Sequence, residues 1–142
     1  MVRDTFPVVV HALLFRDTEL FVLQRANTGF MDGYYCLPGG HQRAGVSVET
    51  ALRRECAEET GAVAVDVQAV CVMPYRSGSH QGLNFVFEVK SWRGQPQLAE
   101  PELFSDARWV SSTGLPEPCA PWIDDVLRAR DEGRWFQELH WR

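Results

Sequence analysis

The segment from residue 38 to residue 62, PGGHQRAGVSVETALRRECAEETGA, constrains this chain more than any other stretch. Two glycines and a polar loop precede Ser47, which is a favourable N-cap residue for a helix over residues 48–59. Gly61 supplies the left-handed residue that commonly ends a helix. The predicted helix carries three glutamates near its C-terminus, where the helix dipole favours positive charge instead.

Glu55, Glu58 and Glu59 are spaced i, i+3 and i+4, so they share an arc of about 100° on the helix surface. Leu52 and Cys56 lie beside this arc and predict an apolar side that packs against a sheet. An acid at a helix C-terminus costs about 0.3–1 kcal/mol, and like charges one turn apart repel one another. Hard divalent cations such as Mg²⁺ or Mn²⁺ prefer carboxylate oxygens and would offset this cost. A plain solvated face would leave the paired glycines unexplained.

The residues from Gly40 to Ala62 resemble the signature of the Nudix (MutT-like) hydrolases, G-x5-E-x7-R-E-U-x-E-E-x-G-U, where U is a bulky apolar residue. Cys56 and Ala62 are small for the apolar positions. Val46 stands where the signature has its first glutamate, and this is the departure that removes a chemical group. Glu49 projects roughly 120° away from Glu55 on the helix and does not replace it.

The resemblance implies water attack on a phosphorus of a nucleoside diphosphate linked to a group X. It also implies that Mg²⁺, or Mn²⁺ in its place, is held by Glu55, Glu58, Glu59 and the carbonyl of Gly39. Arg54 would orient the carboxylates, while Gly40 and His41 would line the substrate site.

Two further roles follow from the resemblance. Arg25 matches a position at which the family often places a phosphate-binding arginine. A general base commonly comes from a late loop, where Glu102 is our first choice and Glu100 the reserve, with Glu55 itself as another option.

Several aromatic residues would either stack on a base or belong to the core: Phe30, Tyr34, Tyr35 and Tyr75. His80 would touch phosphate or be solvated.

The rest of the chain predicts a compact α/β domain. We expect a hairpin of two strands at 8–15 and 20–25, strands at 63–75, 82–92 and 107–110, and a second helix at 121–133. Together with the resemblance, this order implies one Nudix α/β/α sandwich over residues 1–142, with a mixed sheet and two principal helices. Trp135, Phe136 and Trp141 would either pack back or support a homodimer.

Composition narrows the class of protein. A net charge of −5 argues against a partner that is a nucleic-acid polymer. The four cysteines are widely spaced, which predicts reduced thiols in a cytoplasmic protein. The apolar run at residues 8–15 is too short to cross a membrane.

We therefore expect an Mg²⁺-dependent pyrophosphohydrolase that acts on a small nucleotide, first of all a nucleoside triphosphate, releasing the monophosphate and pyrophosphate. The alternatives are a hydrolase of ADP-ribose or of a nucleotide sugar, and a nucleotide-binding regulatory module that Val46 has made catalytically weak.

Overall fold

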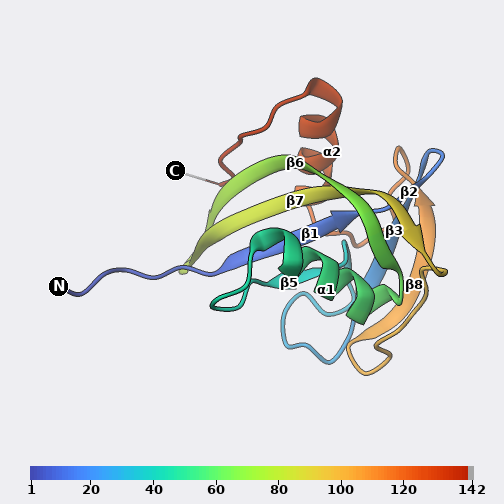
Figure 1. The fold of residues 1–142 in the computed structure, drawn as a ribbon, viewed down its shortest axis with the longest axis horizontal. Helices are drawn as coiled ribbons and strands as arrows, with labels where there is room; N and C mark the ends of the chain where they lie inside the picture. The colour runs from blue at the N-terminus through green and yellow to red at the C-terminus, as the bar shows by residue number, and fades with distance from the viewer. Residues whose placement is uncertain (141–142) are drawn as a thin grey trace.

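The strands form two sheets, and two helices pack against them (Figure 1). The computed structural model describes residues 1–140, so the expectation for Trp141 falls outside the described residues. In chain order the elements are β1 (Val8–Leu13), β2 (Phe15–Arg16), β3 (Glu19–Arg25), β4 (Tyr35–Cys36), β5 (Gly39–His41), α1 (Val48–Thr60), β6 (Val63–Ser77), β7 (His80–Arg93), β8 (Phe104–Ser111) and α2 (Trp122–Glu132).

The first sheet has the strand order β5-β1-β7-β6 and is mixed, because β1 runs parallel to β7 while the other pairs are antiparallel. In the second sheet β3 pairs antiparallel with β2, β4 and β8. The apolar run of β1 suits a strand with neighbours on both edges and cover on both faces. The predicted mixed α/β fold is confirmed.

The two helices lie on opposite sides of the first sheet, with β1, β7 and β6 passing between them in Figure 1. Helix α1 buries Leu52 and Cys56, as the helix periodicity predicts, and it also buries Ala51. Helix α2 buries Ile123, Val126 and Ala129 on its inner side. Burying these side chains, at about 25 cal/mol per Å² of apolar surface, holds both helices to the sheet. The position of α1 therefore depends on its apolar side, which leaves its acidic arc at the edge of the sheet.

The predicted hairpin of 8–15 with 20–25 is partly wrong. The run divides at Leu14, because β1 joins the first sheet while β2 pairs with β3 in the second. The sequence predicts no strand at β5, because its Gly-Gly sequence carries no strand signal. It forms because Gly39 and His41 pair with His11 and Val9 of β1.

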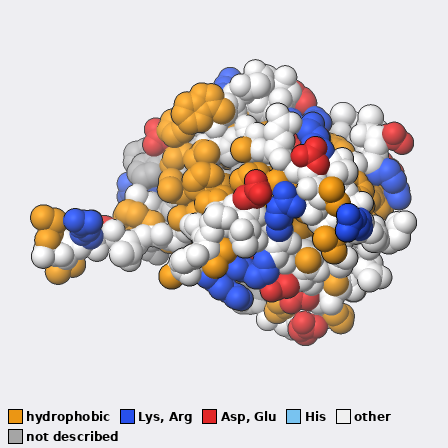
Figure 2. Space-filling view, in the orientation of Figure 1, with side chains coloured by type: hydrophobic (Ala, Val, Ile, Leu, Met, Phe, Trp, Pro, Cys, Tyr) orange, Lys and Arg blue, Asp and Glu red, His pale blue; other side chains and the backbone are white. Residues whose placement is uncertain are grey.

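The segment after α2 runs along the free edge of β6. Backbone hydrogen bonds join Val72 to Trp135 and Gln137, and Leu139 to Pro74. The rings of Trp135 and Phe136 nevertheless stay outside, with exposed fractions of 70% and 44%. Figure 2 shows hydrophobic side chains gathered on this side of the molecule. The segment thus packs back through its backbone, and a homodimer remains a prediction.

All four cysteines lie within the described residues and are unbridged, as predicted from their spacing. Among residues 1–140, neither helix has the length and apolar character needed to cross a bilayer.

Candidate functional site

Helix α1 begins and ends as the sequence predicts. The Ser47 hydroxyl accepts the backbone N–H of Thr50 at 3.1 Å, and Gly61 adopts a φ of +76° while donating its N–H to the Ala57 carbonyl at 2.9 Å. Left-handed backbone of this kind favours glycine. These caps fix where the helix stops, and so they place its last acids beside strand β5.

Glu59 is the most buried of the three acids, with an exposed fraction of 7%. Its Oε1 accepts the N–H of Gly39 at 2.9 Å, which ties the helix to β5. Burial raises the pKa of Glu59 to about 8, and the nearby charges of Glu55 and Glu100 act in the same direction. The Gly39 N–H and the positive charge of Arg25 oppose this effect but do not cancel it. Such a carboxylate is poorly stabilised by the protein alone.

The paired glycines make the close approach of Glu55 possible. A Cβ atom on Gly40 would lie 2.5 Å from Cδ of Glu55, and one on Gly39 would lie 2.1 Å from the Val10 carbonyl oxygen. Both distances are too short for any other residue type without a shift. Glycine at position 40 therefore leaves room for a carboxylate, and glycine at position 39 lets β5 pair closely with β1.

Arg54 connects β5 to the carboxylates. Its Nη2 donates to the His41 carbonyl and to Oε1 of Glu55, both at 3.1 Å, and its Nε lies 3.8 Å from Oε1 of Glu58. Within residues 1–140, this Nε is buried and has no hydrogen-bond partner. The structure thus places Arg54 among the acids it was predicted to orient.

The structure separates the two loop acids proposed as a general base. Burial raises the pKa of Glu100, and the negative charges of Glu102, Glu58 and Glu55 raise it further. Glu102 is exposed, and its carbonyl accepts the Asn27 side chain at 3.4 Å. The reserve candidate is therefore the acid on which the charges of the α1 carboxylates act.

Arg25 and His41 both lie at the site but through different groups. The Arg25 Nε donates to the Phe30 carbonyl at 2.7 Å, so the loop after β3 holds this end of the guanidinium. Its positive charge still acts on Glu59 and opposes the rise in the pKa of that acid that burial causes. The side chain of His41 is exposed, and its backbone carbonyl accepts a hydrogen bond from Arg54.

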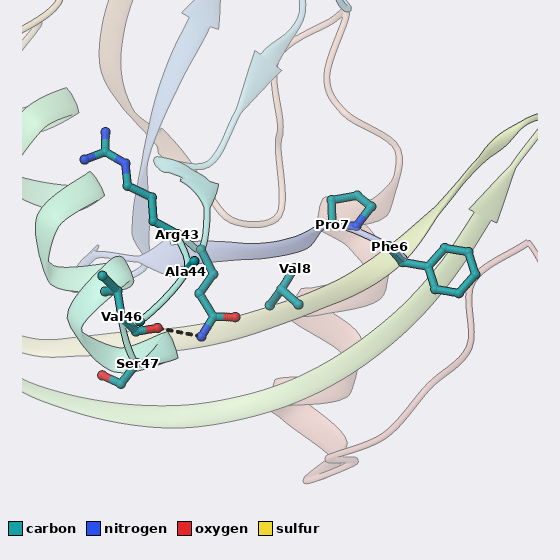
Figure 3. A pocket seen from close by; sticks show the side chains of 9 residues that line it. Phe6, Pro7, Val8, Arg43, Ala44, Val46 and Ser47 are labelled. Atoms are coloured by element: carbon teal, nitrogen blue, oxygen red, sulfur yellow. Dashed lines mark hydrogen bonds between the residues drawn. The ribbon is translucent and has the colours of Figure 1, made fainter. Parts of the chain in front are cut away.

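Val46 lines a shallow groove of about 490 Å³ between the N-terminal segment and the loop before α1 (Figure 3). Phe6, Pro7 and Arg43 line the same groove, and the Val46 carbonyl accepts the Gln42 side chain at 2.7 Å. None of the three glutamates lines it. The Val46 side chain packs partly against the core.

The structure brings together two polar side chains of the first sheet, His11 and Asn84, whose contact the sequence did not predict. His11 Nε2 and Asn84 Oδ1 are 2.9 Å apart, and the His11 ring lies 4.4 Å from the Trp122 ring. Burial lowers the pKa of His11 to about 4, so the ring is neutral at pH 7. Their 73-residue separation leaves no local signal that would connect them.

The donor chemistry of the site fits a hard divalent cation, although the carboxylates do not converge. Within residues 1–140, no three His, Cys, Asp or Glu side chains are arranged as a metal site. Glu59 turns to Gly39 and Glu55 turns to Arg54, so their oxygens point to different partners. Side-chain rotation on one rigid helix face would suffice to bring carboxylates with the spacing i and i+4 together. A divalent ion would also stabilise the buried Glu59 carboxylate.

The fold and this site define a known class of protein. The NUDIX domain model matches residues 5–129, so the chain belongs to the Nudix family, a class of hydrolases acting on phosphoric anhydride bonds. A MutT Nudix hydrolase from Burkholderia pseudomallei superposes with a TM-score of 0.83 at 23% identity, covering 89% of this chain and 98% of that one. The E. coli ORF135 protein superposes with a TM-score of 0.74 at 26% identity, covering 91% of both chains.

One curated relative is similar in sequence over a shorter stretch. An ADP-ribose pyrophosphatase of Methanocaldococcus jannaschii is 38% identical over 56 residues, which cover 39% of this chain and 32% of that protein. This chain therefore matches about a third of the length of that relative. The Nudix domain of Shewanella oneidensis NrtR, solved with ADP ribose, superposes with a TM-score of 0.75 at 22% identity, covering 92% and 89% of the two chains.

Proposed function

We propose that this chain hydrolyses the diphosphate of a nucleoside diphosphate linked to a group X, with Mg²⁺ as the cofactor and Mn²⁺ as a substitute. One observation carries the proposal. Three carboxylates lie on one face of α1 beside strand β5, where Glu59 accepts the Gly39 N–H and the absence of a side chain at Gly40 leaves room for the Glu55 carboxylate.

Each residue of the site has a defined task in this proposal. Glu55, Glu58 and Glu59 would hold the cation, and the Gly39 carbonyl would add a further oxygen. When bound, the cation would neutralise the diphosphate and lower the pKa of the attacking water. Arg54 keeps the carboxylates in place, and Arg25 meets phosphate charge from the side of β3. Gly40 and His41 line the substrate site.

Glu100 is the acid we propose for taking the proton of the attacking water, because its charge interacts with those of Glu55 and Glu58. Glu102 offers a matched comparison in the same loop. Glu100→Gln should lower kcat more than Glu102→Gln does. Equal losses in the two variants would remove Glu100 from this role.

Two substrate classes deserve to be compared directly. Nucleoside triphosphates are the substrates expected from the sequence, with a monophosphate and pyrophosphate as products. ADP-ribose is favoured by the similarity to the Methanocaldococcus jannaschii enzyme. Both contain the same reacting unit, a diphosphate attached to a nucleoside.

The test is to incubate the protein with nucleoside triphosphates, ADP-ribose and nucleotide sugars in the presence of Mg²⁺ or Mn²⁺. Hydrolysis is measured as the release of phosphate, pyrophosphate or nucleoside monophosphate. Glu59→Gln should abolish turnover. Glu49→Gln is the control, since Glu49 is exposed on the same helix and pairs with Arg53 at 3.3 Å. If wild type and Glu59→Gln give the same rates, the proposed function is wrong.

Val46 motivates a second candidate, a module that binds nucleotides without cleaving them. Val46→Glu restores the acid that the family signature has at this position. Turnover by wild-type protein at rates close to those of Val46→Glu would support the enzyme. Nucleotide binding without turnover in wild type, together with turnover in Val46→Glu, would support the binding module instead.

A further inference from the structure

The loop between β3 and β4 presents an aromatic ring to solvent. Phe30 has an exposed fraction of 57%. The loop that carries it is held internally, because the Asp32 carboxylate accepts the N–H groups of Thr28 and Gly29 at 3.0 Å each, and the Gln24 side chain donates to the Gly33 carbonyl at 2.9 Å. The exposure of the Phe30 ring is therefore a consequence of a fixed loop shape.

A second aromatic ring faces Phe30 from a distant part of the chain. His80 begins β7 at the turn that follows β6, and its ring centre lies 6.3 Å from that of Phe30 with the planes inclined by 55°. Both residues are exposed. Scattered single aromatics are common on protein surfaces. Two exposed rings brought together by separate loops instead form one continuous aromatic surface with no room for a third ring between them, and we name it the Phe30–His80 clamp.

Arg25 connects this clamp to the carboxylates of α1. Its Nε holds the Phe30 carbonyl at 2.7 Å, and its guanidinium carbon lies 5.5 Å from the Phe30 ring centre. The same positive charge acts on Glu59. A positive group thus stands between the acids that would hold a metal–diphosphate unit and an exposed aromatic surface. This order of negative, positive and aromatic groups matches the order of cation, phosphate and base in a nucleotide complex.

We propose that the Phe30–His80 clamp binds the base of the nucleotide, with the exposed face of Phe30 as the stacking surface and the His80 ring contacting the edge of the base. The proposal rests on the proposed function for the class of ligand. Stacking is available to every base, because each has an aromatic face. The clamp therefore supplies affinity for a nucleoside over free phosphate, and it tolerates different bases.

The test is equilibrium binding, measured by calorimetry with Mg²⁺ present. The ligands are ADP, GDP, CDP, UDP and, as a probe without a base, inorganic pyrophosphate. Phe30→Ala should weaken binding of the preferred nucleoside diphosphate by about 5- to 150-fold and leave pyrophosphate binding unchanged. His80→Ala should act in the same direction with a smaller effect, and Phe30→Tyr should keep wild-type affinity.

Trp135→Ala is the matched control, because this ring is 70% exposed on the segment after α2. This variant should bind the nucleoside diphosphate and pyrophosphate with wild-type affinity. Thermal melting of each variant shows whether it is folded. An equal loss of nucleoside diphosphate and pyrophosphate affinity in Phe30→Ala, or no loss at all, would overturn the clamp. So would a wild-type protein that binds none of the four nucleoside diphosphates. If wild type binds them through Phe30 but hydrolyses no nucleotide, the clamp stands and the proposed function fails.

Discussion

Two buried glutamates show how differently this fold treats the same side chain. Glu59 of α1 and Glu88 of β7 have exposed fractions of 7% and 9%. Glu88 accepts the Arg130 Nε at 2.6 Å and lies 3.2 Å from the Lys90 Nζ. Burial alone would raise its pKa, but these two cations outweigh burial and lower it. Burial raises the pKa of Glu59 to about 8 because its surroundings compensate its charge poorly.

The helices that carry or meet these acids differ in the same way. Helix α2 has Asp124 and Asp125 in its first turn and Arg130 in its last, which is the favourable arrangement for a helix dipole. The last turn of α1, which the structure describes in full, has no basic residue. One helix thus has charges placed for stability. The other has charges that favour a bound cation, and its stability in the absence of metal is reduced by that arrangement.

The largest expected difference is in turnover. Under the proposed function, Glu59→Gln should lower kcat by at least about 100-fold, because even residues that only support a metal ligand contribute 10- to 100-fold. Its stability without metal at pH 7 should be equal to wild type or higher, because a carboxyl whose folded pKa is raised to about 8 by burial costs stability at that pH. Rates of nucleotide hydrolysis and thermal melting with EDTA measure the two quantities. A clear loss of stability with normal kcat would reverse the roles assigned to Glu59 and Glu88.

Gly40→Ala tests the close approach of Glu55 without changing any charge. The new Cβ would lie 2.5 Å from Cδ of Glu55, so the carboxylate must move aside. The displaced atoms belong to the end of a flexible side chain, so the free energy of unfolding should fall by less than about 1 kcal/mol. A displacement of this size should lower kcat roughly 10- to 100-fold. Urea unfolding and steady-state kinetics test both parts, and unchanged kinetics would mean that Glu55 works from another position.

Glu88→Gln should affect stability and leave the site intact. The variant keeps the shape but loses the charge-assisted hydrogen bond to Arg130, whose partial exposure limits the loss to about 1–2 kcal/mol. Urea unfolding at pH 7 measures this loss, and kcat per folded molecule should equal that of wild type. A drop in kcat at unchanged stability would show that Glu88 takes part in the reaction.

The smallest expected effect is the pH dependence of the stabilisation that the Glu88–Arg130 ion pair provides. The folded pKa of Glu88 lies below its unfolded value, which is about 4.3. Its contribution is therefore fully present above that value and is lost as the pH falls through the folded pKa. The difference in unfolding free energy between wild type and Glu88→Gln should shrink between pH 5 and pH 3, as followed by urea unfolding. A difference that stays constant over this range would show that the ion pair is not its source.

Local signals in the sequence predicted helix α1 well. Ser47 and Gly61 cap it as expected because capping depends on residues within one turn. The apolar side at Leu52 and Cys56 follows from helix periodicity, which is also local. Strand β5 was missed because two glycines carry no strand propensity, and its pairing with β1 is supplied by residues about 30 positions away.

The sequence by itself determined the family signature, the caps and the spacing of the three glutamates, because these depend on residues close together in the chain. The tertiary structure decided that the charges of Glu55 and Glu58 act on Glu100 of the late loop. It also decided that His11 meets Asn84 and that Phe30 meets His80. Contacts of this kind depend on how strands and loops far apart in the sequence are brought together, and no local pattern of residue types records that arrangement.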